Sequence, residues 1–245
     1  MFIFPKKIIY FFGSSKILKS FRDWFFDRSK IIKKSKFIKW NGFNFFLSAP
    51  PQILRKAYYK GIESSLTRAM LKLINPNSNI IDIGASYGFI SIVLSRAVND
   101  KGGKVFSFEA DYDIVQNLNN SLKKNKIKNV NIFNNFVGNE SIKNIRTVDS
   151  LITNDNLNID LIKIDTDGTD LDALKGCSKI IKKSQPIIVI EINNNYDIIY
   201  KYLENMGYGY FYDQYLNNIE SYRPNYNRIP NLIASTKKLN PANLL

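Results

Sequence analysis

The stretch Ile80-Ile-Asp-Ile-Gly-Ala-Ser-Tyr-Gly88 joins a short apolar run to a turn that carries two glycines. The residues that follow, Phe89 to Ala97, show a helical spacing of apolar side chains. The segment therefore predicts a buried strand, a glycine turn and a helix. Because ligands of parallel-sheet proteins bind at the carboxyl ends of strands, the turn is a candidate binding loop.

Three known motifs compete for this turn. Gly84, Ser86 and Gly88 match G-x-S-x-G, the nucleophile elbow of esterases, but the chain contains no histidine to activate the serine. The dinucleotide-binding motif G-x-G-x-x-G needs a glycine at position 86 and a third glycine, and both are missing. The third motif, D-x-G-x-x-x-G counted from Asp82, is that of S-adenosylmethionine loops, in which the acid can face the methionine ammonium group.

The alternation of strand and helix continues along the chain. Strand-like apolar runs occur at 104–108, 130–133, 160–164, 187–190 and 231–235, and helical spacing occurs at 62–74, 114–124 and 171–182. This order predicts an α/β fold with a doubly wound, mostly parallel sheet. The run at 231–235 is predicted to be the final strand, at an edge of the sheet.

An acid, Glu109, follows the strand predicted at 104–108. A carboxylate at that place accepts two hydrogen bonds from vicinal ribose hydroxyls. NAD enzymes use the same device, so Glu109 alone leaves both cofactors open.

A second group of charged residues follows the strands predicted at 160–164 and 187–190. Lys163 and Asp165 share a strand face because they lie two residues apart. Asp167 comes in the next turn, and Glu191 ends the later strand. Such acids can orient a hydroxyl, accept its proton or hold a divalent cation. Asp170 can instead stabilise the start of a helix through the helix dipole.

Together these motifs resemble the FkbM-type family of S-adenosylmethionine-dependent methyltransferases. The matching stretches are 80–88, 105–111, 147–151, 160–168, 174–176 and 186–191. The resemblance implies a Rossmann-like class I methyltransferase fold, with a seven-stranded sheet whose last strand is antiparallel. It also implies O-methylation of a hydroxyl on a sugar, glycan or related metabolite.

The resemblance further implies roles for individual residues. Asp82, Gly84, Ser86 and Gly88 would form the loop on the methionine side of S-adenosylmethionine, and Glu109 would hold the ribose. Asn135 and Phe136 would lie near the adenine. Asp165 would lie near the transferring methyl group, and the base would be Asp165, Asp167, Glu191 or Lys163. The family usually has Asn at position 86 and Glu at positions 167 and 170, so these acids are one methylene shorter here. No metal site is predicted, although a divalent ion is compatible with the acids.

The basic charge of the chain is concentrated at its amino end. Residues 1–60 hold 14 of the 35 Lys and Arg residues but only two acids, and 16 of the 33 aromatic residues. Their net charge of +12 leaves +2 for residues 61–245. We therefore expect a basic, aromatic extension over 1–60 and a methyltransferase domain over 61–245. The extension is predicted to contain an amphipathic helix near 17–25 and a hairpin whose turn is Asn41-Gly42.

A basic amphipathic helix with Trp and Phe is expected on an anionic membrane surface. The alternatives are RNA, held through phosphates and stacked bases, and packing of the extension against its own domain. The apolar run at 8–12 is too short to span a bilayer. The single cysteine, Cys177, excludes an intramolecular disulfide and favours a small buried side chain in a cytoplasmic protein, peripheral at a membrane. The expected acceptor is a small molecule or a glycan, and the oligomeric state is open.

Overall fold

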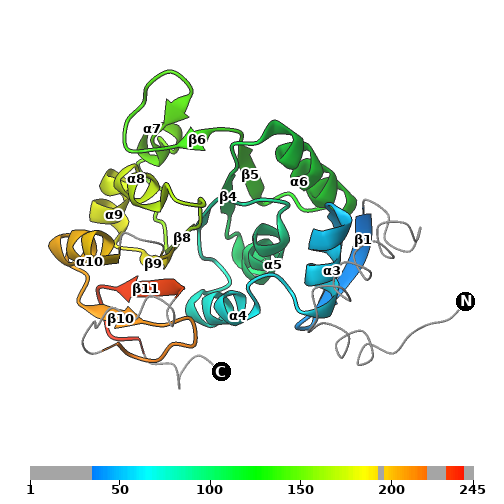
Figure 1. The fold of residues 1–245 in the computed structure, drawn as a ribbon, viewed down its shortest axis with the longest axis horizontal. Coiled ribbons are helices and arrows are strands. Elements are labelled where there is room, and N and C mark those ends of the chain that lie inside the picture. Colours follow the sequence, from blue (N-terminus) through cyan, green and yellow to red (C-terminus); the bar gives the residue numbers. More distant parts are fainter. Residues whose placement is uncertain (1–34, 193–195, 220–229, 240–245) are drawn as a thin grey trace, which may run out of the picture. The chain divides into compact units, whose positions relative to one another are not determined.

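The computed structural model describes residues 35–192, 196–219 and 230–239 (Figure 1). By its internal contacts the chain divides into two units, Met1–Ile62 and Glu63–Leu245. The amphipathic helix expected near 17–25 lies outside the described residues.

The described part of the first unit is a hairpin followed by a helix. Strands β1 (Ser35–Trp40) and β2 (Phe43–Ser48) pair antiparallel, and helix α3 spans Pro51–Tyr59. Asn41 and Gly42 form the turn with φ of 46° and 82°, as the Asn-Gly dipeptide predicts. Helix α3 was not predicted, because the two prolines at 50 and 51 indicated the end of the extension. Pro51 is the first residue of the helix. The N–H of a first residue makes no hydrogen bond within the helix, so proline, which has no N–H, removes none there.

The second unit is built on a seven-stranded sheet. Its order is β10 (Tyr210–Tyr212), β11 (Asn231–Ser235), β9 (Ile187–Glu191), β8 (Leu161–Ile164), β3 (Ile80–Ile83), β4 (Val105–Phe108) and β5 (Val130–Phe133). The five strands from β9 to β5 are parallel, and β11 is antiparallel to both of its neighbours. The expected mostly parallel sheet of seven strands is confirmed.

The edge position expected for 231–235 is wrong. All five residues of β11 are buried, because the strand lies between β9 and β10. The edge strand is β10, whose three residues are too few to show a strand period. The chain thus places its last strand inside the sheet.

The helices of the second unit lie between its strands along the chain, except α4, which precedes β3. They are α4 (Ser64–Leu73), α5 (Phe89–Val98), α6 (Tyr112–Lys124), α7 (Val148–Leu151), α8 (Asp170–Lys175), α9 (Ser178–Ser184) and α10 (Tyr196–Asn205), with a short 3₁₀ turn at Asn99–Lys101. The single helix expected over 171–182 is two helices. They divide at Gly176, where a Cβ atom would lie 2.2 Å from the carbonyl oxygen of Gly138. The chain bends there to let two backbone segments approach.

Strand register brings the predicted site residues to one edge of the sheet. Ile83 pairs with Phe108 on one side and with Ile164 on the other, and Ile164 pairs with Ile190. The residues that follow these partners therefore lie at the same level, at the carboxyl ends of the four strands. They are Gly84, Glu109, Asp165 and Glu191.

Candidate active site

The loop after β3 crosses directly over the end of β8. Gly84 has φ of +75°, and a Cβ atom there would lie 1.7 Å from the backbone oxygen of Asp165. The backbone N–H groups of Gly84 and Ala85 both donate to the carbonyl oxygen of Phe108. Glycine is required here by backbone packing, and that packing holds the loop beside Asp165.

The Glu109 carboxylate is held by backbone donors. Ser86 N–H donates to Oε2 and Asp111 N–H donates to Oε1, each at 2.9 Å. Ser86 has the left-handed φ of 51° that aims its N–H at this carboxylate. Each oxygen keeps a second lone pair, so Glu109 remains able to accept from vicinal hydroxyls.

The loop after β5 is tied to the same edge by a residue that the sequence did not single out. The Asn134 amide donates to the carbonyl oxygens of Glu109 and Ala110, both at 3.0 Å. Two residues later, Phe136 begins β6 (Phe136–Val137), which pairs with β7 (Ile145–Arg146). The Phe136 ring is 43% exposed and Asn135 is half-buried. An exposed ring two residues after Asn134, which bonds to Glu109 and Ala110, suits a stacked base.

Tyr87 is a further neighbour that the sequence did not indicate. Partial burial and the nearby acids Asp111 and Glu109 raise the pKa of its hydroxyl. Tyr87 thus stays neutral at physiological pH and offers a donor close to Glu109.

Asp82, which the resemblance assigns to the methionine side of the cofactor, lies beneath the loop. It is fully buried on β3, and its Oδ2 accepts from Ser91 Oγ at 2.5 Å. Ser107 Oγ in turn donates to Ser91 Oγ at 3.0 Å. The other carboxylate oxygen of Asp82, Oδ1, lies 3.5 Å from Lys163 Nζ. The contacts of Asp82 are with groups beneath the loop.

Lys163 is equally buried, and its surroundings do not support a role as the base. Burial alone would lower the pKa of its ammonium, but the carboxylates of Asp82, Asp165 and Glu63 together raise that pKa above its usual value. A lysine held protonated cannot accept a proton at neutral pH. Lys163 is therefore a fixed positive charge.

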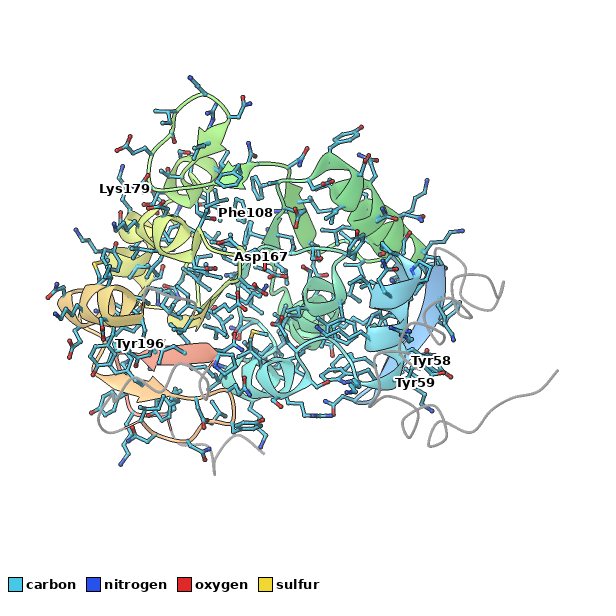
Figure 2. All side chains as sticks on the ribbon, viewed as in Figure 1. Tyr58, Tyr59, Phe108, Asp167, Lys179 and Tyr196 are labelled. Atoms are coloured by element: carbon cyan, nitrogen blue, oxygen red, sulfur yellow. The ribbon has the colours of Figure 1, made fainter. Side chains whose placement is uncertain are left out.

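Three acids gather at the ends of β8 and β9. Carboxylate oxygens of Asp165, Asp167 and Glu191 lie within 4.8 Å of one another. Asp165 is 23% exposed at its side chain, while Asp167 (labelled in Figure 2) is exposed and has a left-handed φ of 52°. A non-glycine residue in that conformation is strained, and such strain is concentrated at functional sites.

Asp170 stabilises the loop that carries Asp167. Its Oδ1 accepts from the backbone N–H and the hydroxyl of Thr166, at 2.7 and 3.0 Å, and its Oδ2 accepts from Gly168 N–H at 3.3 Å. It is only 4% exposed. Asp170 therefore shapes the site from beneath.

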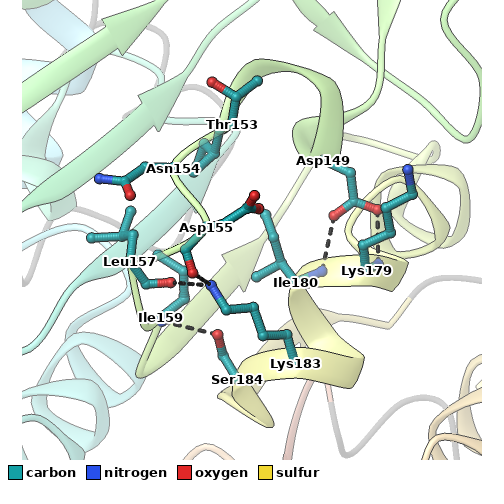
Figure 3. A pocket seen from close by; sticks show the side chains of 11 residues that line it. Asp149, Thr153, Asn154, Asp155, Leu157, Ile159, Lys179, Ile180, Lys183 and Ser184 are labelled. Atoms are coloured by element: carbon teal, nitrogen blue, oxygen red, sulfur yellow. Dashed lines mark hydrogen bonds between the residues drawn. The ribbon is translucent and has the colours of Figure 1, made fainter.

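A separate cavity of about 250 Å³ lies beside α9 (Figure 3). Its polar groups bond one another: the Lys183 ammonium donates to the carbonyl oxygens of Asp155 and Leu157, and Asp149 accepts from the backbone of α9. Its lining includes Ile159, which precedes β8, and none of the predicted site residues. This cavity lies apart from the carboxyl edge.

Two family models match parts of the chain. Residues 131–210 match the methyltransferase FkbM domain, and residues 32–142 match protein-L-isoaspartate(D-aspartate) O-methyltransferase. The predicted resemblance to the FkbM-type family is confirmed. No curated protein matches the chain.

Two solved structures share its architecture. A methyltransferase FkbM from Methylobacillus flagellatus is 20% identical with a TM-score of 0.54, and the match covers 76% of this chain and 53% of that protein. A 16S rRNA methyltransferase of T. thermophilus, solved with AdoMet and guanosine, is 16% identical with a TM-score of 0.53, over 85% and 52% of the two chains. The Rossmann-like class I methyltransferase fold is confirmed. This chain spans about half the length of each protein.

Proposed function

We propose that this chain, which resembles the FkbM-type methyltransferases, is an S-adenosylmethionine-dependent O-methyltransferase that acts on a hydroxyl of a sugar, glycan or related metabolite. One observation carries the proposal. Glu109, whose carboxylate can still accept from a ribose, and the three acids of the cluster lie at the carboxyl ends of β4, β8 and β9, on the same edge of one sheet.

The residues of the cofactor half fit the chemical groups of S-adenosylmethionine. Glu109 presents fixed acceptors for the two ribose hydroxyls, and the Phe136 ring is exposed for the adenine. The loop from Gly84 to Gly88 runs between these groups and Asp165. When bound, the cofactor supplies a methyl group on a sulfonium, which is already an activated electrophile.

The acceptor half needs one group that orients the hydroxyl and one that removes its proton. Asp165 Oδ2 lies 3.3 Å from the Lys163 ammonium, and this ion pair holds the carboxylate in one place, as the orientation of a hydroxyl requires. Among the described residues, no hydrogen bond or ion pair holds the Asp167 carboxylate. We therefore assign proton removal to Asp167 and orientation to Asp165. Positioning can contribute ~7–11 kcal/mol, and proton removal ~10²–10⁴-fold.

The proposal includes no metal ion. The Lys163 ammonium already forms an ion pair with Asp165 at 3.3 Å, so it competes with a divalent cation for that carboxylate. We expect turnover in excess chelator to equal turnover without it. A loss of turnover that added Mg²⁺ restores would show that the acids hold a metal.

Thermal unfolding with S-adenosylhomocysteine, with NAD and without ligand tests the cofactor. S-adenosylhomocysteine should raise the melting temperature, because a ligand that binds only the folded chain stabilises it. NAD should leave it unchanged. Stabilisation by NAD alone would overturn the proposal.

We further propose that the basic extension rests on an anionic membrane. Between residues 35 and 62 the chain has five basic residues and no acid: Lys36, Lys39, Arg55, Lys56 and Lys60. On the hairpin, Phe37 is 66% exposed and packs edge-on against Phe46. No helix in the described part of the chain is long and apolar enough to cross a membrane. Basic groups beside an exposed ring suit contact with a lipid surface.

The second candidate function is RNA binding or RNA methylation, which the same basic and aromatic residues favour. Sedimentation with anionic and neutral vesicles, in parallel with RNA retention, separates the two. The membrane proposal expects anionic vesicles alone to retain the chain, and Phe37→Ala to weaken retention more than Phe136→Ala. Salt-sensitive retention on RNA, without vesicle binding, would favour the alternative.

A further inference from the structure

The ammonium of Lys163 has three close oxygen partners: it donates a hydrogen bond to the backbone of Gly84 and forms ion pairs with Asp165 and Asp82. Its Nζ lies 3.2 Å from the backbone oxygen of Gly84, 3.3 Å from Asp165 Oδ2 and 3.5 Å from Asp82 Oδ1. The residue is 2% exposed. These three partners belong to the two halves of the proposed site and to the buried strand beneath them.

A single counter-ion would satisfy the charge of a buried lysine, and Asp82 already provides one. The two residues are direct partners in the register of β3 and β8, so the pair could exist without any other contact. Lys163 also contacts Gly84 and Asp165, and charge balance with Asp82 does not require these contacts. They join the carbonyl oxygen of the cofactor loop to the carboxylate that faces the acceptor.

The charges around Lys163 point to the same link between Gly84 and Asp165. Two carboxylates, Asp82 and Asp165, share one ammonium, and Glu63 also contributes to its field. Without the cation the two acids would repel each other across the end of the sheet, and the Gly84 carbonyl would lose a charged donor. The loop and Asp165 would then move independently.

We propose that Lys163 is a positioning residue that fixes the cofactor loop and Asp165 at one separation. The inference rests on the proposed function, since it concerns the geometry of the same site. Lys163 is buried, and its hydrogen-bond and ion-pair partners are protein groups. It acts through Gly84 and Asp165, and a displacement of about 1 Å at such a site can cost ~10²-fold in rate.

The test must separate positioning from simple charge balance. Lys163→Met alone leaves Asp82 buried without a counter-ion, which is expected to destabilise the fold. The double variant Asp82→Asn, Lys163→Met removes both buried charges, and the Asn side chain keeps an acceptor for Ser91. Urea unfolding reports whether stability returns, and calorimetric titration with S-adenosylhomocysteine reports the geometry of the loop.

Positioning predicts that the double variant recovers much of the stability lost in the single variant. Its affinity for S-adenosylhomocysteine should remain reduced by about tenfold or more. A double variant that is stable and binds like the wild type would overturn the inference and leave the proposed function intact. A wild-type chain that does not bind S-adenosylhomocysteine would overturn the proposed function itself.

A second pair of variants decides the matter if the double variant does not unfold cooperatively. Lys163→Arg keeps a cation, whereas Lys163→Gln keeps a neutral donor on a side chain one atom shorter. Retained affinity in the Arg variant with a loss in the Gln variant supports positioning by the charge. Equal affinities in the two variants contradict it.

Discussion

Gly84 shows how one residue constrains this edge of the sheet. Its sequence motif predicted a ligand loop, but the requirement for glycine comes from the backbone oxygen of Asp165, which a Cβ atom would meet at 1.7 Å. Such a contact joins residues 81 positions apart and leaves no trace in the local pattern. The motif therefore located the loop, while the reason for the glycine needed the structure.

Substitution of Gly84 tests this contact. Gly84→Ala adds both a steric clash and the strain of a positive φ, so we expect a loss of about 2–5 kcal/mol in unfolding free energy. Gly102→Ala is the matched control, because Gly102 has a φ of +83° but no atom within 4 Å of the added Cβ. The control should lose only about 1 kcal/mol, measured by urea unfolding. Equal losses in the two variants would contradict the clash.

The raised pKa of Lys163 predicts how the stability of the folded chain changes with pH. The carboxylates around it raise its pKa in the folded chain above the value of about 10.4 in an unfolded chain. Its stabilisation is therefore complete below about pH 10.4 and is lost as the pH rises through the folded pKa. The difference in stability between the wild type and Lys163→Met should be constant from pH 7 to 9 and shrink at higher pH. A difference that grows with pH would contradict the assignment.

At the scale of elements, the sequence predicted what depends on local periodicity. The strands β3, β4, β5, β8 and β9 and the helices α4, α5 and α6 follow from apolar spacing over four to thirteen residues. The pattern failed where length or packing decides: β10 has three residues, and α8 and α9 divide where Gly176 packs closely against the backbone of Gly138. Neither the short length of β10 nor the packing of Gly176 against Gly138 produces a pattern in the neighbouring sequence.

The loop between β8 and α8 depends on a side chain that the sequence could only connect with a helix dipole. Asp170→Ala removes the acceptors of Thr166 and Gly168, so we expect a loss of about 2 kcal/mol or more in stability. Asp172→Ala is the control, since Asp172 is exposed in the first turn of the same helix. Urea unfolding that ranks the two variants equally would show that Asp170 acts only through the dipole.

At the scale of the whole molecule, charge and chemistry are divided between the two ends of the sequence. Residues 1–60 have a net charge of +12, while the remainder, which holds every proposed site residue, has +2. Composition alone revealed that division. The pairing of Lys163 with Asp82 and the backbone donors of Glu109 could not be predicted, because they depend on the register of strands far apart in the sequence.

The charge of the extension predicts a salt dependence. Retention on anionic vesicles should fall steeply between low salt and 0.5 M salt, because a Debye length of about 8 Å at physiological salt already screens most of the attraction. The double variant Lys36→Glu, Lys39→Glu should be retained less than the wild type. The double variant Lys123→Glu, Lys124→Glu, with both changes in α6, is the control. Retention that is indifferent to salt would point to apolar contact alone.

Calorimetric titration of S-adenosylhomocysteine into the wild type and Glu109→Ala tests the account most directly. The variant loses two charge-assisted acceptors for the ribose hydroxyls, so its affinity should fall by about 10- to 100-fold. Unfolding in urea, run on both proteins, checks that the fold is retained. Equal affinities in two folded proteins, or no binding to the wild type, would contradict the assignment of this edge as a site for S-adenosylmethionine.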